Sequence, residues 1–337
     1  MGKDIDPPND GDFFSTDVLG KVWREAWGVA RTVDFLPPWQ PITDFVGSPA
    51  GWVDEEESEL APPTPETIDE RFGSLFQAVV PRVGWLRSHP TSIPRDERDD
   101  PFPDEAWFFI NGIGTDVALL RSHGRLLEAL FGRRFELIYN PTDGVMVDLV
   151  ESVLGRTFDL ASEPAAYAYR RLLDALEAEH HRKVVLLAHS QGGIIASNIV
   201  RRLIDEGYDT ALLEKLEIYT FASAADSMEV HAEASDAAGR LVPYVEHFAN
   251  LDDPIARLGI LRAFDAETAQ RYCGEVYVLN RRGHLFNTHY LPELRKRAYE
   301  SPHRGAEESR LYAYLEGARP DLFMAMHGEP TSDDVEQ

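Results

Sequence analysis

After Pro103 the apolar residues fall into short, almost continuous runs, separated by segments in which they recur every three or four positions. Runs without alternation are typical of strands buried on both faces, as in a parallel sheet. They predict strands at Ala106–Ile110, Phe135–Tyr139, Lys183–Ala188, Leu216–Phe221, Pro243–Ala249 and Glu275–Leu279. The helical spacing predicts helices between them, notably at Val117–Phe131, Pro164–His180 and Gly192–Glu206. Strands alternating with helices indicate an α/β fold with a mainly parallel central sheet of about six strands, flanked by helices.

The region before this pattern, residues 1–100, is rich in proline and acidic side chains. Two amphipathic stretches within it, from Ser15 to Val33 and from Thr67 to Val80, carry apolar residues at helical spacing. It has no long apolar strand of its own. We therefore predict a mostly helical extension over residues 1–100 that packs on a main domain spanning residues 101–337.

Composition and charge narrow the classes of protein that fit this pattern. The chain has 337 residues, 43% of them hydrophobic, and its 33 basic and 58 acidic side chains give a formal charge of −25. The apolar content excludes a disordered chain. Because so acidic a surface repels phosphate backbones, we expect no nucleic-acid partner. The longest apolar runs have about five residues, whereas a membrane-spanning helix needs about 20, so we expect no integral membrane segment.

The number of cysteines indicates in which kind of cellular compartment the protein is expected. Cys273 is the only cysteine, which excludes an intrachain disulfide and a cysteine-based metal cluster and favours a reducing compartment. The first residues contain no apolar core of signal-peptide length. We therefore expect a cytoplasmic protein without a metal site, and the sequence leaves its oligomeric state open.

The segment Val184–Ala196 carries the clearest chemical signal. A buried strand runs directly into Ala-His-Ser-Gln-Gly and then into a helix, which is the setting of a nucleophile elbow. Small residues are needed at Ala188 and Gly192 because the chain turns so tightly there that its neighbours nearly touch. The turn is expected to lift the Ser190 hydroxyl clear of the sheet at the amino end of the helix, where the helix dipole favours developing negative charge.

These residues resemble the elbow of the α/β-hydrolase superfamily, specifically its serine esterases and lipases, and the match covers about Phe102 to Pro302. The resemblance implies that residues 101–337 form a catalytic domain, with nucleophile, acid and histidine in that chain order. Ser190 would be the nucleophile. It needs an adjacent imidazole to take its proton, and the imidazole needs a carboxylate to fix its tautomer. No cofactor is implied.

Two aspartates stand side by side where the acid is expected, shortly after the strand that ends near Ala249. The run from Asp253 to Leu258 resembles the acid loop of fungal-type lipases, which implies that Asp253 is the acid. Asp252 is then a solvated or loop-capping neighbour. Asp226, past the preceding strand, is a further acid position that some members of the superfamily use.

Two histidines follow the last predicted strand. His284 stands in a Gly-His step, where the superfamily's loop usually carries its base. His289 stands at the predicted start of the final helix, with Thr288 as its expected cap. We favour His284 as the base and retain His289 as the alternative, and the histidine that is not the base is expected to order the loop by hydrogen bonding.

The loop after the first core strand is expected to supply the second oxyanion donor. The match to lipases implies that the backbone N–H groups of Gln191 and Ile113 form the oxyanion hole. Asn111 or Thr115 would brace this loop, and Asn111, Gly112 and His189 are the expected substrate-binding residues. The apolar stretch Val145–Leu154 is either a core helix or a lid over the site.

The resulting hypothesis is a carboxylic-ester hydrolase, an esterase or lipase that works through an acyl-enzyme. The negative charge of the chain favours a neutral small-molecule ester over an anionic phospholipid. A thioesterase or an amidase would use the same residues, and the sequence does not separate them. A non-catalytic binding protein on the same fold is the alternative from another functional class.

Overall fold

The computed structural model describes residues 92–94, 100–112, 115, 117–140, 163–235, 241–303 and 309–320. Nearly all of the predicted extension over residues 1–100 lies outside the described residues. The stretch Val145–Leu154 and the expected oxyanion donor Ile113 also lie outside them.

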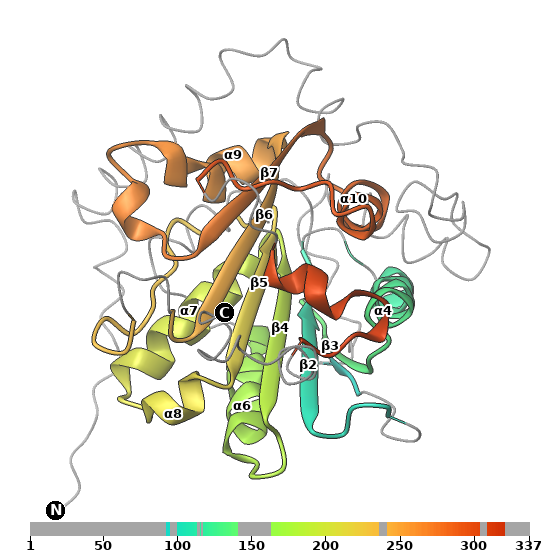
Figure 1. Cartoon of the computed structure of the whole chain (residues 1–337), viewed down its shortest axis with the longest axis vertical. Helices are drawn as coiled ribbons and strands as arrows, with labels where there is room; N and C mark the ends of the chain where they lie inside the picture. Colours follow the sequence, from blue (N-terminus) through green and yellow to red (C-terminus); the bar gives the residue numbers. More distant parts are fainter. Residues whose placement is uncertain are drawn as a thin grey trace, which may run out of the picture. The chain divides into compact units, whose positions relative to one another are not determined.

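The fold is built on a seven-stranded sheet with the strand order β1-β3-β2-β4-β5-β6-β7 (Figure 1). Its strands are β1 Ser92–Ile93, β2 Glu105–Ile110, β3 Phe135–Ile138, β4 Lys183–His189, β5 Leu216–Phe221, β6 Tyr244–Asp252 and β7 Glu275–Arg282. All neighbouring strands from β3 to β7 run parallel, and β1 pairs antiparallel with β3 at the edge. The six predicted strands are therefore confirmed. β1 was not predicted because two residues make no apolar run.

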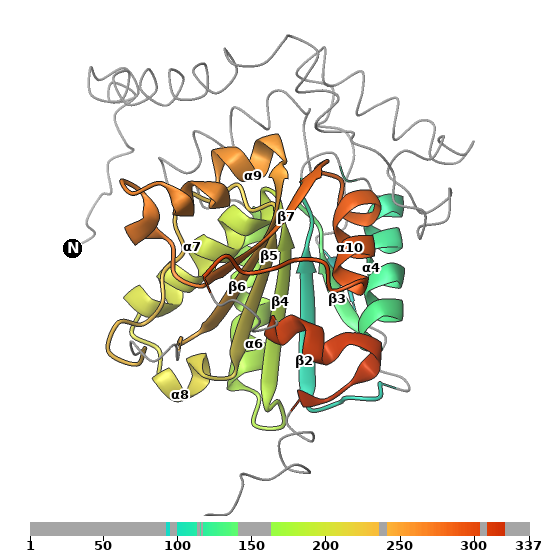
Figure 2. The same ribbon diagram turned by 45° about the horizontal axis from the view of Figure 1, so that its top comes forward.

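The three predicted helices are confirmed as α4 Val117–Phe131, α6 Glu163–Glu177 and α7 Gly192–Asp205. Three short helices lie later in the chain, namely α8 Thr210–Leu213 between α7 and β5, α9 Pro254–Leu258 after β6 and α10 Leu291–Arg295 after β7. Apolar side chains of α4 and α10 pack on one face of the sheet, whereas those of α6, α7 and α8 pack on the other (Figure 2). The helices thus cover both faces, as a parallel sheet requires.

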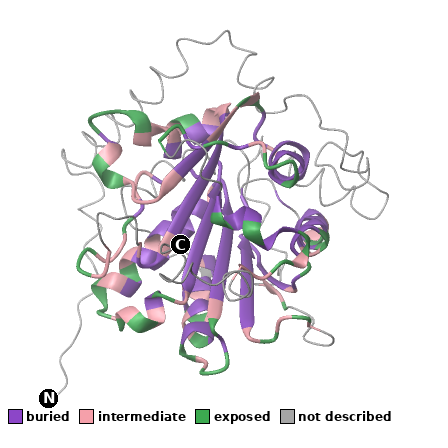
Figure 3. Cartoon of the chain, in the orientation of Figure 1, coloured by how far each residue is buried: buried purple, intermediate pink, exposed green. Residues whose placement is uncertain are grey.

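The hydrophobic core consists of two clusters, one on each face of the sheet, because the strands are buried on both faces. Along β2 the side chains of Trp107 and Phe109 join the cluster under α4, whereas Ala106, Phe108 and Ile110 join the cluster under α6 and α7. The central strands are buried along almost their whole length (Figure 3). This two-sided burial explains why the strands read as continuous apolar runs instead of alternating ones.

Buried carboxylates stand near the starts of several strands, at the edge of the sheet opposite the strands' carboxyl ends. Glu105 pairs with Arg133, with 2.8 Å between the Arg133 Nε and a carboxylate oxygen. Glu217 pairs with Lys183 at 2.7 Å and with Arg310 at 2.9 Å. These two carboxylates therefore have partners of opposite sign, which offset part of their desolvation cost. Glu217–Arg310 and a further pair between Glu105 and Arg319 attach the segment from Ser309 to Arg319 to the sheet.

Candidate active site

The turn between β4 and α7 holds Ser190 in a strained conformation. Ser190 has a backbone φ of 56°, a value that residues other than glycine rarely adopt. The close approach is visible at two glycines: a Cβ on Gly112 would lie 2.6 Å from the Ser190 Cβ, and a Cβ on Gly192 would lie 2.6 Å from the Ile110 carbonyl oxygen. The sequence-based requirement for a small residue at position 192 therefore has a steric cause.

The carboxyl ends of β4, β6 and β7 bring Ser190, Asp253 and His284 into one chain of hydrogen bonds. The distance from the His284 Nε2 to the Ser190 Oγ is 2.9 Å. The His284 Nδ1 lies 2.8 Å from one carboxylate oxygen of Asp253 and 3.0 Å from the other. All three side chains are buried, with 3% or less of each residue exposed. Because carboxylate oxygens accept, Nδ1 carries a proton, which leaves Nε2 of the neutral ring to accept from the serine hydroxyl.

The Asp253 carboxylate is fixed by the chain that follows it. Asp253 is the N-cap of α9, and its Oδ1 accepts from the backbone N–H groups of Ile255 at 2.8 Å and Ala256 at 3.2 Å. Asp252, in contrast, forms an ion pair with Arg257 and is partly exposed. The helix cap therefore orients one of the two adjacent aspartates toward the imidazole.

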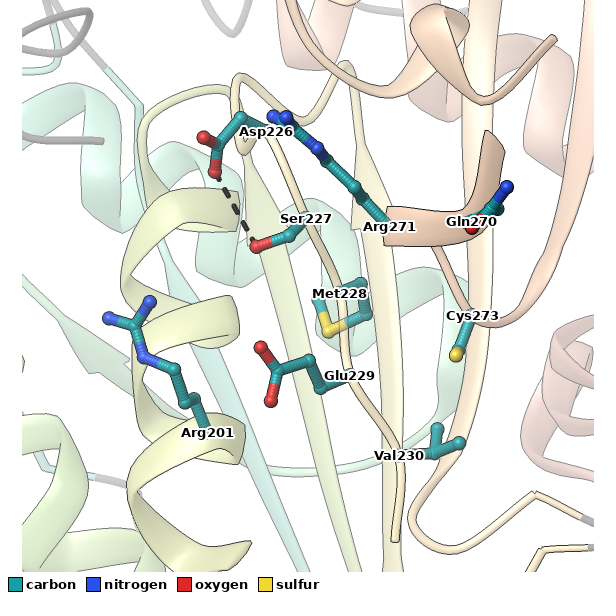
Figure 4. Close-up of a pocket in the computed structure, with 9 residues that line it drawn as sticks. All are labelled: Arg201, Asp226, Ser227, Met228, Glu229, Val230, Gln270, Arg271 and Cys273. Carbon is teal, nitrogen blue, oxygen red and sulfur yellow. Dashed lines mark hydrogen bonds between the residues drawn. The ribbon is translucent and has the colours of Figure 1, made fainter. Parts of the chain in front are cut away.

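Asp226 lies elsewhere, at the rim of a separate cavity of about 410 Å³ (Figure 4). The cavity wall includes Arg201 from α7 and Arg271 from the segment before β7, together with the partly buried Cys273. None of Ser190, Asp253 and His284 lines this cavity. Among the described residues, no group of three or more histidines, cysteines, aspartates or glutamates is arranged to hold a metal ion.

His289 makes different contacts from His284. Its Nδ1 accepts a hydrogen bond from the backbone N–H of Leu285 at 2.9 Å, within the loop that carries His284. The expected cap at Thr288 is wrong, because a π-helical turn spans Phe286–Tyr290 and includes Thr288, and no side chain caps it. His289 thus lies inside a helical turn instead of at a helix start.

His189 reaches across from β4 to the loop after β7. Its Nε2 donates to the backbone carbonyl of His284 at 2.8 Å. Burial, followed by the proximity of His284 and His123, holds the pKa of His189 well below its usual 6.5. The imidazole is therefore neutral near pH 7, and its Nε2–H tethers the main chain of His284.

The expected oxyanion region is cross-linked by two asparagines. Asn111 was expected to bind substrate or to brace its loop, and its side chain bonds to main-chain groups: Oδ1 accepts from the Asn140 N–H at 2.8 Å, and Nδ2 donates to the Asn140 carbonyl at 3.0 Å. The Asn140 side chain in turn donates to the Gln191 Oε1 at 2.7 Å. Gln191 is the N-cap of α7, so its N–H belongs to a helix end where amide groups lack intrahelical acceptors.

The sequence analysis did not identify Asn140 and Tyr290, whose side chains hydrogen-bond to Gln191 and Asp253. The Tyr290 hydroxyl donates to the Asp253 Oδ2 at 2.7 Å. No sequence signal marks these residues, because Asn140 is 51 positions from Gln191 and Tyr290 is 37 positions from Asp253. Only the meeting of distant strand ends creates these contacts.

The sheet order, the helices on both faces and the sharp turn between β4 and α7 define the α/β-hydrolase fold. No protein-family model matches the chain, and no curated protein matches its sequence. Among solved structures, the chain is similar to a Pyrobaculum calidifontis esterase at 14% identity, covering 64% of this chain and 89% of that one, with a TM-score of 0.36. It is also similar to alpha/beta hydrolase domain-containing protein 10 from mouse at 13% identity, covering 60% of this chain and 88% of that one, with a TM-score of 0.33. Within the described residues, no helix has the length and apolar character needed to cross a bilayer.

Proposed function

We propose that the protein is a serine hydrolase that cleaves carboxylic esters through an acyl-enzyme intermediate. The observation that carries this proposal is the continuous hydrogen-bond chain from the Ser190 Oγ through His284 to the Asp253 carboxylate, with links of 2.9 and 2.8 Å. A serine hydroxyl is a weak nucleophile by itself and becomes a strong one when an oriented imidazole can remove its proton.

In the first half of the reaction, Ser190 Oγ attacks the ester carbonyl while its proton moves to the His284 Nε2. The new bond converts the carbonyl oxygen into an oxyanion, which the N–H groups of Gln191 and Ile113 are proposed to bind. The tetrahedral intermediate then collapses, the bond to the alkoxy oxygen breaks, and the leaving alcohol takes the proton from His284. Asp253 holds the imidazolium in orientation throughout.

In the second half, water attacks the acyl-enzyme and gives its proton to the His284 Nε2. Collapse of the second tetrahedral intermediate returns that proton to the Ser190 oxygen and releases the carboxylic acid. Thioesters and amides pass through the same steps with a thiol or an amine as the leaving group. The formal charge of −25 supports a neutral substrate, because an anionic ester is repelled as it approaches.

Labelling with a fluorophosphonate probe, followed by identification of the modified residue, tests this proposal directly. We expect the probe to modify Ser190, and we expect Ser190→Ala to abolish both labelling and hydrolysis of a short p-nitrophenyl ester. Ser197→Ala is a matched control, because Ser197 lies on α7 and its hydroxyl donates to the Ser227 carbonyl instead of to a histidine. That variant should keep full labelling.

An unlabelled wild-type protein would contradict the proposal and favour a non-catalytic binding protein on the same fold. Full hydrolysis by Ser190→Ala would contradict the assignment of the nucleophile. A panel of oxygen esters, thioesters and amides of increasing acyl length then separates the three leaving groups and ranks the acyl chains by kcat/KM.

A further inference from the structure

Tyr290 is a fully buried tyrosine that touches the acid of the proposed catalytic chain. Its exposed fraction is 0%, and its hydroxyl lies 2.7 Å from the Asp253 Oδ2. The same carboxylate oxygen lies 2.8 Å from the His284 Nδ1. One oxygen atom of Asp253 therefore interacts with both the phenol and the imidazole.

The direction of the phenol hydrogen bond follows from a second contact. The backbone N–H of Asn250 donates to the Tyr290 hydroxyl oxygen at 3.1 Å. Burial, followed by the nearby Asp253 charge, raises the pKa of Tyr290 well above 10, so the phenol keeps its proton. Because the carboxylate only accepts, that single proton points at Asp253.

Asn250 and Tyr290 also join the two loops that carry the acid and the base. The Asn250 side-chain amide donates to the Gly283 carbonyl at 2.9 Å, one residue before His284. The Asn250 Oδ1 accepts from the Tyr299 hydroxyl at 3.1 Å. The end of β6 and the loop after β7 are thereby held at a fixed distance.

We propose that Tyr290 is a positioning residue that orients the Asp253 carboxylate and weakens its hold on a protonated His284. This role of Tyr290 in catalysis rests on the proposed function, in which His284 is the base. The phenol draws negative charge toward itself on the oxygen that faces the imidazole. The carboxylate then stabilises the imidazolium less than it would without the phenol.

Other titratable groups also face the imidazole and its acid. His189 has its ring centroid 4.7 Å from that of His284, and its lowered pKa keeps it neutral. Tyr299 packs on Tyr290 with a centroid distance of 6.1 Å, and burial raises its pKa as well. Neither group changes charge between pH 6.5 and 9, so both leave the effect of Tyr290 visible in that range.

The test is the pH dependence of kcat/KM for a p-nitrophenyl ester with Tyr290→Phe, which keeps the ring and removes the donor. We expect the acid limb of the profile to move to higher pH by about 0.5 to 1 unit. KM should change less than about twofold, because the Tyr290 side chain is fully buried and its hydroxyl contacts Asp253. Site-specific replacement of Tyr290 by 3-fluorotyrosine, a stronger hydrogen-bond donor, should move the acid limb in the opposite direction.

Tyr299→Phe is the matched control, because it removes a buried hydroxyl from the same cluster without touching Asp253. Its acid limb should stay at the wild-type position within the error of the measurement. An unmoved limb in both Tyr290 variants, or equal shifts in Tyr290→Phe and Tyr299→Phe, would overturn the proposal. Near-ultraviolet circular dichroism checks that each variant is folded.

A second readout needs no turnover. Nitrogen NMR of isotopically labelled imidazoles follows the titration of His284 directly, and its midpoint should rise in Tyr290→Phe. If that midpoint rises while the wild type hydrolyses no ester, the phenol's effect on the pair is supported and the proposed function is contradicted. If esters are hydrolysed and the midpoint is unmoved, the proposed function stands and the role of Tyr290 is rejected.

Discussion

The Asn140 side chain donates a hydrogen bond of 2.7 Å to the Gln191 side chain, and so ties the end of β3 to the start of α7. Asn140 is itself held by Asn111, which bonds to both its N–H and its carbonyl group. A chain of three polar side chains thus runs along the carboxyl edge of the sheet beside Ser190. We infer that it fixes the backbone whose N–H groups would face an oxyanion.

Removing this tie should slow the reaction without removing a reacting group. For Asn140→Ala we expect kcat to fall about three- to tenfold, which corresponds to one lost neutral hydrogen bond. KM should change little, because the oxyanion forms only after the substrate is bound. Steady-state kinetics checks this, with Asn198→Ala as the control, since the Asn198 amide oxygen accepts from Arg201 on α7. An unchanged kcat in Asn140→Ala would contradict the role of the tie.

Alanine substitutions should show which of the two candidate histidines is the catalytic base. We expect His284→Ala to lose at least 10³-fold in kcat, approaching the loss in Ser190→Ala, because no other base then removes the serine proton. His289→Ala removes the acceptor of the Leu285 N–H but no group of the hydrogen-bond chain from Ser190 to Asp253, and should lose about tenfold or less. A greater loss in His289→Ala than in His284→Ala would transfer the role of base to His289.

The buried carboxylate of Glu217 should matter greatly for stability. It is 2% exposed and faces Lys183 and Arg310, as well as the hydroxyls of Tyr219 and Tyr314. Glu217→Gln removes the negative charge that both cations face, and we expect the free energy of unfolding to fall by about 3 kcal/mol.

Urea unfolding measures this change, and Glu128→Gln supplies the comparison. Glu128 pairs with Arg134 at 3.0 Å, but about a third of each side chain is exposed. Water screens that pair, so we expect a loss of about 0.5 kcal/mol or less. Similar losses in the two variants would contradict the account given for Glu217.

Stability should fall on mild acidification because His247 is buried in its neutral form. Its Nδ1 accepts from the Thr220 hydroxyl at 2.7 Å, and its Nε2 donates to the Cys273 carbonyl at 3.0 Å. Burial lowers the pKa of His247 from 6.5 to about 4. Between these two pH values the unfolded chain binds a proton that the folded chain excludes, so the free energy of unfolding rises with pH.

The expected contribution of His247 is a loss of about 3 kcal/mol as pH falls from 6.5 to 4. Urea unfolding at several pH values across this range measures it. His247→Gln should lower the slope of the free energy of unfolding against pH by about one proton. His189, whose lowered pKa acts in the same direction, stays in both proteins, so the difference isolates His247. Identical slopes would contradict the prediction.

The sequence determined the fold class and most element boundaries of the core. Strands buried on both faces must be apolar throughout, and helices on a sheet must be apolar on one side, so both leave a periodic record in the chain. The helix Val117–Phe131 and the strand Leu216–Phe221 begin and end where their patterns do. The tight turn at Ser190 could also be predicted from the sequence, because only small residues fit beside it.

Tertiary structure alone decided which polar residues meet. From the sequence, resemblance alone favoured Asp253 over Asp252 and His284 over His289, and no pattern marked Asn140 or Tyr290. In the structure one aspartate caps α9 and faces the imidazole, while its neighbour faces Arg257. Periodicity records burial along one element, whereas a hydrogen bond between strand ends depends on the register and direction of separate strands, which no local pattern encodes.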